Sequence, residues 1–309
     1  MALSNMTRLD SRESAFFARQ TEYIKTATYD AKTPALKGLT LVPQASGIPQ
    51  GIREITYRRF AEAGEAKLVA NYAKDFPRVD VFGEEDTVKV FDIGDSYGYN
   101  IKEIRESALA GTGLDRRRAL AARNAIERKL NSLTLVSDKK AGTYGILDFP
   151  GITEATLPAD GDGSSKSWAS KDADKIIRDI NILLNAVIEP TKGAEVPDTL
   201  LLPLPVYTAL QSRRLGDTQV SLIKYISDNF QTLKKIDWLN ELGSIGTGGS
   251  GRVMVGCFDA MHCENQIVNQ FEQGDVQQEG FEFKIPCIAS TAGSIVYYPG
   301  AFAFADGAC

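Results

Sequence analysis

Residues 51–99 form a long, charged segment that alternates like a β-hairpin and contains few large apolar side chains. Residues 55–57, 79–81 and 88–90 each alternate apolar with polar residues, and glycine and proline mark the turns between them. An isolated hairpin of this kind is only marginally stable in water. The segment must therefore lie on a surface, supplied either by its own domain or by a neighbouring subunit.

The clearest helix is predicted over residues 114–136, with Asp95 or, for a later start, Thr112 as its N-cap. At 1.5 Å per residue it would be about 34 Å long, enough to run along one face of a domain. Its basic face favours a solvated or salt-bridged surface, and contact with phosphate is the alternative. Its apolar stripe, at spacings of three and four, is Ala119, Ala122, Ile126, Leu130 and Leu133.

The rest of the chain mixes helices and strands without simple βαβ alternation, which predicts an α+β fold. Helices are expected at 11–29, 172–187 and 205–210, from Thr218 through Ile226, and at 233–242. Strands are expected at 199–202, 252–258, 281–285 and 294–298. No apolar run reaches the ~18 residues that a membrane helix needs, so no membrane contact is expected.

Charge is unevenly distributed along the chain. The formal net charge is −5, yet residues 1–60 hold nine Lys and Arg against five Asp and Glu. A mildly basic arm of +4 thus precedes an acidic body of −9. Two interpretations stay open: a solvated arm that clasps a neighbour, or an arm that contacts nucleic acid.

The residues offer no catalytic constellation. His262 is the sole histidine, and no two of the four cysteines form a C-x-x-C pair, so buried free thiols and an ordinary polar histidine are expected. Residues 246–251 match G-x-G-x-x-G, but the pattern lies between an expected helix and a strand, the reverse of a dinucleotide site. Residues 160–167 lack the complete P-loop and calcium-loop patterns and indicate a surface loop. We expect no enzyme activity, metal or cofactor.

Five strings resemble the major capsid proteins of tailed bacteriophages with the Hong Kong 97-type fold, in a subfamily related to encapsulins. The order of the elements is also similar: a polar arm, an extended charged loop, one long helix and a mixed body. The resemblance runs over nearly the whole chain. The strings lie at residues 64–72, 77–81, 93–100, 144–151 and 200–203.

This resemblance implies a division of the chain and a structural function. Residues 1–50 would be the N-terminal arm, 51–98 the E-loop, 99–200 the spine helix and first part of the peripheral domain, and 201–309 the axial domain with strands returning to the peripheral domain. The protein would self-assemble as pentamers and hexamers into the icosahedral shell around a double-stranded DNA genome. It would be found in the virion capsid, and in the host cytoplasm during assembly. An encapsulin-like compartment enclosing cargo protein is the alternative.

The resemblance also implies partners and contact residues. Besides copies of itself, the partners would be a portal, scaffolding or cement proteins, and DNA bound without sequence specificity. The glycine loop at 243–251 would let one chain tilt differently in pentamers and hexamers. Candidate DNA-facing residues are Arg8, Arg12, Arg19 and Lys25. Candidate E-loop contacts between subunits are Arg53, Glu54, Arg58, Arg59, Glu62, Glu65 and Lys67.

Overall fold

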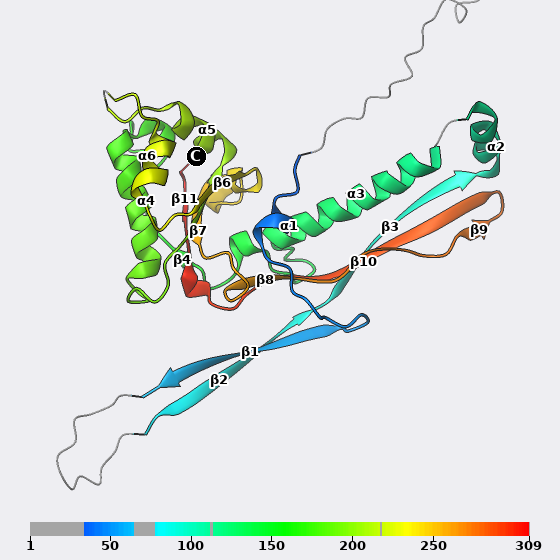
Figure 1. Ribbon diagram of the computed structural model, residues 1–309, viewed down its shortest axis with the longest axis horizontal. Helices are drawn as coiled ribbons and strands as arrows, with labels where there is room; N and C mark the ends of the chain where they lie inside the picture. The colour runs from blue at the N-terminus through cyan, green and yellow to red at the C-terminus, as the bar shows by residue number, and fades with distance from the viewer. Residues whose placement is uncertain (1–33, 65–77, 112–113, 217, 309) are drawn as a thin grey trace, which may run out of the picture. The chain divides into compact units, whose positions relative to one another are not determined.

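The computed structural model describes residues 34–64, 78–111, 114–216 and 218–308, with the side chains of 61–63 and 114–116 left out (Figure 1). Leu36–Cys309 form one unit and Met1–Ala35 another.

The α+β class is confirmed. The helices are α1 Gly38–Leu41, α2 Ile101–Ala110, α3 Leu114–Leu135, α4 Ala173–Ile188, α5 Leu204–Ser212 and α6 Leu222–Asn229. The strands are β1 Glu54–Ala63, β2 Asp80–Lys89, β3 Phe91–Asn100, β4 Thr153–Glu154, β5 Thr199–Pro203, β6 Lys235–Leu239, β7 Arg252–Gly256, β8 Cys263–Gln273, β9 Gln277–Glu279, β10 Glu282–Val296 and β11 Phe302–Asp306.

A five-stranded sheet in the order β4-β11-β7-β5-β6 forms the first half of the body, with α4, α5 and α6 gathered around it (Figure 1). Every residue of β5 is buried, because both faces of the sheet are covered. Leu200 and Leu202 pack in the core that holds α4, while Leu201 belongs to a second core on the opposite face. The expected buried strand at 199–202 is confirmed.

A second sheet, in the order β3-β10-β8 with β9 also paired to β10, forms the other half. Helix α3 runs along it (Figure 1). Ile126 and Leu130 of the helix pack against Cys287 and Ala289 of β10. The apolar stripe at helical spacing therefore faces the sheet.

Four expectations about local structure are wrong. Asp95 lies within β3, and a separate helix, α2, begins after Asn100, which forms a capping box with Glu103. Residues 233–242 contain strand β6 and a short 3₁₀ turn instead of a helix. Helix α6 follows Ser221, not Thr218. Residues 281–285 and 294–298 do not form two strands, because β10 runs through from Glu282 to Val296.

Two expected features fall outside the described residues: the helix at 11–29 and the alternative cap Thr112. Within the described part of the chain, no helix combines the length and the apolar character that crossing a membrane requires.

Candidate interaction surfaces

The hairpin of β1 and β2 carries a ladder of cross-strand polar pairs on its middle rungs. The strands are antiparallel, with Arg58 opposite Glu85 and Arg59 opposite Glu84. Arg58 Nε lies 3.1 Å from Glu85 Oε2, and Arg59 Nη2 lies 2.5 Å from Asp86 Oδ2. Opposite charges at such positions mainly fix the register of the two strands of the hairpin. They add little to its stability, because exposed ion pairs contribute little free energy to folding.

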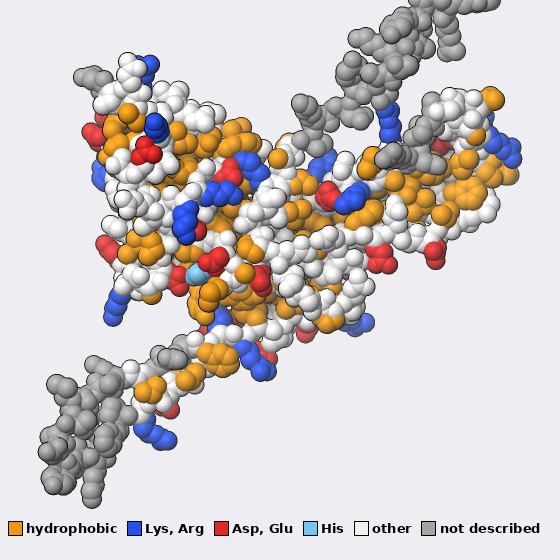
Figure 2. Space-filling model, viewed as in Figure 1, with side chains coloured by type: hydrophobic (Ala, Val, Ile, Leu, Met, Phe, Trp, Pro, Cys, Tyr) orange, Lys and Arg blue, Asp and Glu red, His pale blue; other side chains and the backbone are white. Residues whose placement is uncertain are grey.

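Large apolar side chains are exposed farther along the same hairpin, next to residues 65–77 (Figure 2). The exposed fractions are 65% for Phe60, 62% for Phe82, 66% for Val79 and 59% for Val81. The Phe60 ring lies over Gly83, where an added Cβ would come within 3.1 Å of it. An apolar ribbon end of this kind is typical of a surface that a partner covers.

The other end of the hairpin is attached to the body. The rings of Tyr57 and Tyr297 meet edge to face with their centroids 5.5 Å apart. Val90 N donates to Arg53 O, which closes the hairpin just before the chain enters β3. Between the hairpin and the body lies a groove of about 520 Å³, lined by Phe60, Phe82 and Tyr298 among others. The attachment holds the hairpin without covering its apolar end.

The structure places the candidate E-loop residues unevenly. Arg53, Glu54, Arg58 and Arg59 lie in or just before β1, and the backbone of Glu62 pairs with Val81. Glu65 and Lys67 lie outside the described residues, as do the candidate DNA-facing residues Arg8, Arg12, Arg19 and Lys25.

The spine-helix candidates lie on one side of α3. Ala122, Ile126, Leu130 and Leu133 are buried, and Ala119 is half-buried. On the basic side, Arg123 Nε lies 2.8 Å from Glu127 Oε1, and Lys129 Nζ lies 3.5 Å from Asp138 Oδ2. Arg118 reaches Glu103 of α2 at 3.0 Å. Part of this helix face is thus salt-bridged, while Arg128 Nε donates to the backbone O of Asn124 at 3.2 Å.

The chain just after residue 35 is anchored to both halves of the body, which the sequence did not indicate. Lys37 Nζ lies 2.5 Å from Asp237 Oδ1 and 3.5 Å from the centre of the Trp238 ring. Gly38 N donates to Asn131 Oδ1 at 2.8 Å, and a Cβ at Gly38 would clash with Leu135. Only glycine can bring the backbone this close to α3.

The glycine loop at 243–251 is tied to the end of β11, where Gly307 N donates to Gly251 O at 2.9 Å. Thr247 N donates to Asp306 Oδ2 at 2.8 Å, and Arg252 Nε lies 2.7 Å from Asp306 Oδ1. Burial would raise the pKa of Asp306, but the hydrogen bonds from Arg252 and Thr247 outweigh it and lower that pKa. The proposed role of this loop in subunit tilting stays a prediction.

A buried ion pair links the loop at 158–171 to α4. The side chains of Lys171 and Asp179 are both fully buried, and Lys171 Nζ lies 2.6 Å from Asp179 Oδ2. Lys171 Nζ also donates to Pro158 O at 2.7 Å and lies 3.3 Å from Asp160 Oδ1. None of the residues in the expected surface loop at 160–167 is buried, whereas Trp168 and Lys171, just after it, lie in the interior.

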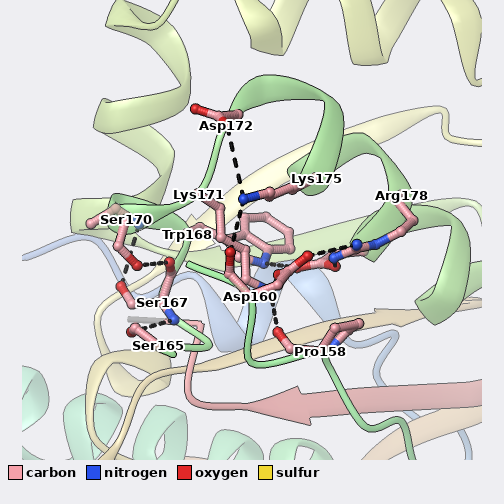
Figure 3. Close-up of polar contacts among 12 residues, drawn as sticks. Pro158, Asp160, Ser165, Ser167, Trp168, Ser170, Lys171, Asp172, Lys175 and Arg178 are labelled. Atoms are coloured by element: carbon pink, nitrogen blue, oxygen red, sulfur yellow. Dashed lines mark hydrogen bonds and ion pairs between the residues drawn. The ribbon is translucent and has the colours of Figure 1, made fainter. Parts of the chain in front are cut away.

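Asp179 is satisfied on both oxygens. Trp168 Nε1 donates to Oδ2 at 3.1 Å, and Arg178 Nη2 donates to Oδ1 at 2.9 Å. Arg178 Nη1 also pairs with Asp160 Oδ2 at 2.7 Å (Figure 3). The sequence did contain a signal for this cluster. Asp179 is a charged residue on the same apolar side of α4 as Ile176 and Ile180, and a buried carboxylate needs a partner.

Acid should weaken this cluster. The hydrogen bond from Arg178, aided by Lys171, lowers the pKa of Asp160 from 3.8 to about 2. Because the folded-state pKa lies below the unfolded one, Asp160 stabilises the fold above about pH 4 and loses this effect as the pH falls toward about 2. We expect Asp160→Asn to flatten the dependence of the thermal midpoint on pH in that window. The matched control is Asp172→Asn, whose side chain is 88% exposed. Equal pH dependence in Asp160→Asn and the unaltered chain would contradict this prediction.

Three of the four cysteines, Cys257, Cys263 and Cys287, are buried free thiols, as expected, and Cys309 lies outside the description. His262 lies in the connection between β7 and β8. Its ring is held between Asp259 and Glu195, the second of which is 67 positions earlier in the chain.

The comparisons with known proteins agree with the fold. The family model described as major capsid protein matches residues 64–308. No curated protein matches the chain. The capsid of Myoviridae phage XM1 is 17% identical with a TM-score of 0.80, over 95% of this chain and 99% of that one. The capsid of a native GTA particle is 9% identical with a TM-score of 0.68, over the full length of both. A virus-like particle from Pyrococcus furiosus is 13% identical with a TM-score of 0.54, over 87% and 91%.

Proposed function

The chain belongs to the major capsid protein family, and on this premise we propose that it assembles as hexamers and pentamers into an icosahedral shell around the double-stranded DNA genome of a tailed bacteriophage. The family is structural, not enzymatic, and its place is the virion capsid. The host cytoplasm is the proposed place of assembly.

The observation that carries the proposal is the exposed apolar end of the β1–β2 hairpin. Phe60, Val79, Val81 and Phe82 are each at least 59% exposed. A monomer would leave this surface in water, whereas contacts between neighbouring subunits bury surfaces of this kind. The charge pairs of Arg58 and Arg59 beside it would set the register of such a contact.

The proposed division of the chain follows the family pattern. Residues 1–50 are the arm, 51–98 the E-loop, 99–200 the spine helix and first part of the peripheral domain, and 201–309 the axial domain with its returning strands. The arm, with Arg8, Arg12, Arg19 and Lys25, faces the DNA in this proposal. Its contact would be with phosphate and thus independent of sequence. A portal and scaffolding or cement proteins complete the set of partners.

An encapsulin-like compartment that encloses cargo protein is the second candidate. The observation in its favour is the fold likeness to the virus-like particle from Pyrococcus furiosus. The net positive charge of residues 1–60 favours the DNA-containing shell.

Electron microscopy of the purified chain, produced alone and together with its gene neighbours, tests the proposal. We expect closed icosahedral shells or free hexamers and pentamers, and nucleic acid in the shells made with the neighbours. Nucleic acid is measured as ultraviolet absorbance relative to protein. Shells that contain protein cargo and no nucleic acid would support the encapsulin-like alternative. A stable monomer under both conditions would overturn the shell function.

A further inference from the structure

Three side chains of metal-ligating types meet beside the turn between β7 and β8. One ligand atom each from Glu195, Cys257 and His262 lies within 4.8 Å of the others. Glu195 comes from the segment between α4 and β5, Cys257 follows β7 directly, and His262 immediately precedes β8. The fold thus brings together groups that lie as far apart as 67 positions in the chain.

The histidine is oriented as a metal-binding histidine is. Its Nδ1 lies 2.5 Å from Asp259 Oδ1, and its Nε2 lies 2.7 Å from Glu195 Oε2. The Asp259 carboxylate is itself fixed, because it accepts from the backbone N of Met261 and of His262. A carboxylate on one ring nitrogen that directs the other toward a cation is the usual second layer of a zinc site.

The surroundings suit a partly shielded cation. The His262 side chain is 14% exposed and that of Glu195 28%, and Cys257 is buried. The thiol of Cys257 donates to Val196 O at 3.2 Å, so its proton has a partner in the structure. A bound cation replaces that proton, which leaves to solvent.

We propose that Glu195, Cys257 and His262 bind one divalent cation of the zinc class, with Asp259 as a positioning residue. Thiolate, imidazole and carboxylate are the donors that Zn²⁺ takes, and the mixed set argues against Ca²⁺ or Mg²⁺, which take oxygen ligands. Three protein ligands leave a fourth, tetrahedral position for water.

The position of the site gives the cation a structural effect. Strand β7 belongs to the five-stranded sheet and β8 to the other, so residues 257–262 are a crossing between the two sheets. Tyr297 N, on a second crossing, donates to His262 O at 2.8 Å. A cation here ties this junction to the segment after α4, and should raise the thermal midpoint of the protein.

Titration of the metal-free full-length protein with Co²⁺ tests the site. We expect one equivalent per chain and a thiolate-to-cobalt charge-transfer band, which excess Zn²⁺ displaces. The band should be lost in Cys257→Ser. Affinity should fall at least about tenfold in His262→Gln and about 10–100-fold in Asp259→Asn, which keeps the band. The matched control is Cys287→Ser, a buried thiol in β10, which should bind normally.

X-ray absorption at the zinc edge, measured on the unaltered protein, tests the site without any variant. It therefore remains decisive if one of the variants does not fold. One sulfur and one imidazole around zinc are expected. No cobalt band, a band that persists in Cys257→Ser, or a zinc shell without sulfur would each overturn the site. None of these results bears on shell assembly, which microscopy measures separately.

Discussion

Asp179→Leu is expected to lower the free energy of unfolding by about 3–5 kcal/mol, because it leaves the Lys171 ammonium buried with one partly exposed carboxylate. It also removes the acceptor of Trp168 Nε1. Urea unfolding of the unassembled chain measures the loss. Tryptophan fluorescence is a direct signal, since Trp168 lies in the cluster and is one of only two tryptophans in the sequence.

Two controls separate the buried charge from other effects. The double variant Lys171→Met with Asp179→Leu should cost less than Asp179→Leu alone, because a buried pair replaced by apolar groups leaves no unpaired charge. Lys102→Met removes an ion pair whose side chains are 83% and 66% exposed, and should change stability by less than about 0.5 kcal/mol. A cost for Asp179→Leu no larger than that of Lys102→Met would refute the role of this pair.

Phe60→Ser combined with Phe82→Ser is expected to abolish closed shells while the chain stays folded. Each phenylalanine contributes about 1.5–3 kcal/mol when fully buried. Losing both, about 3–6 kcal/mol, should weaken each subunit contact by at least about a hundredfold, and a shell repeats that contact many times. Both rings are more than 60% exposed in the single chain, so the fold itself should lose little. Sedimentation measures the shells, and circular dichroism the fold.

The matched control for assembly is Thr56→Ser, on the same face of β1 as Phe60. Its hydroxyl keeps the 2.9 Å contact with Thr87 that joins the two strands. We expect normal shells from this variant. Normal shells from the double phenylalanine variant would instead mean that the hairpin end is not a subunit contact.

Secondary structure was predicted best where the spacing of apolar residues alone determines it. Helix α3 and the fully buried β5 follow from helical spacing and from a short apolar run. Strand β10 was missed as one strand because Pro286 and Gly293 look like breaks. The register shifts in its pairing with β8, and the positive φ of 80° at Gly293, are what let the strand continue.

The candidate sites were harder to predict, because they depend on contacts between distant positions. Arg58 and Arg59 are charged residues in a segment that alternates apolar with polar side chains. That alternation is a local pattern, so the hairpin could be identified from the sequence alone. The pairing of His262 with Glu195 has no local signal, since only the fold of two sheets and their crossings brings them together. The exposure of Phe60 and Phe82 likewise depends on where the hairpin leaves the body.

The anchor at residues 37–45 makes the start of the chain sensitive to the geometry of the whole body. Lys37 is fixed to β6 of one sheet, Gly38 to α3 on the other, and Ala45 N donates to Asn265 O of β8. One short segment therefore contacts β6, α3 and β8, and so joins elements of both halves of the body. A change in the angle between the two sheets would alter these contacts together.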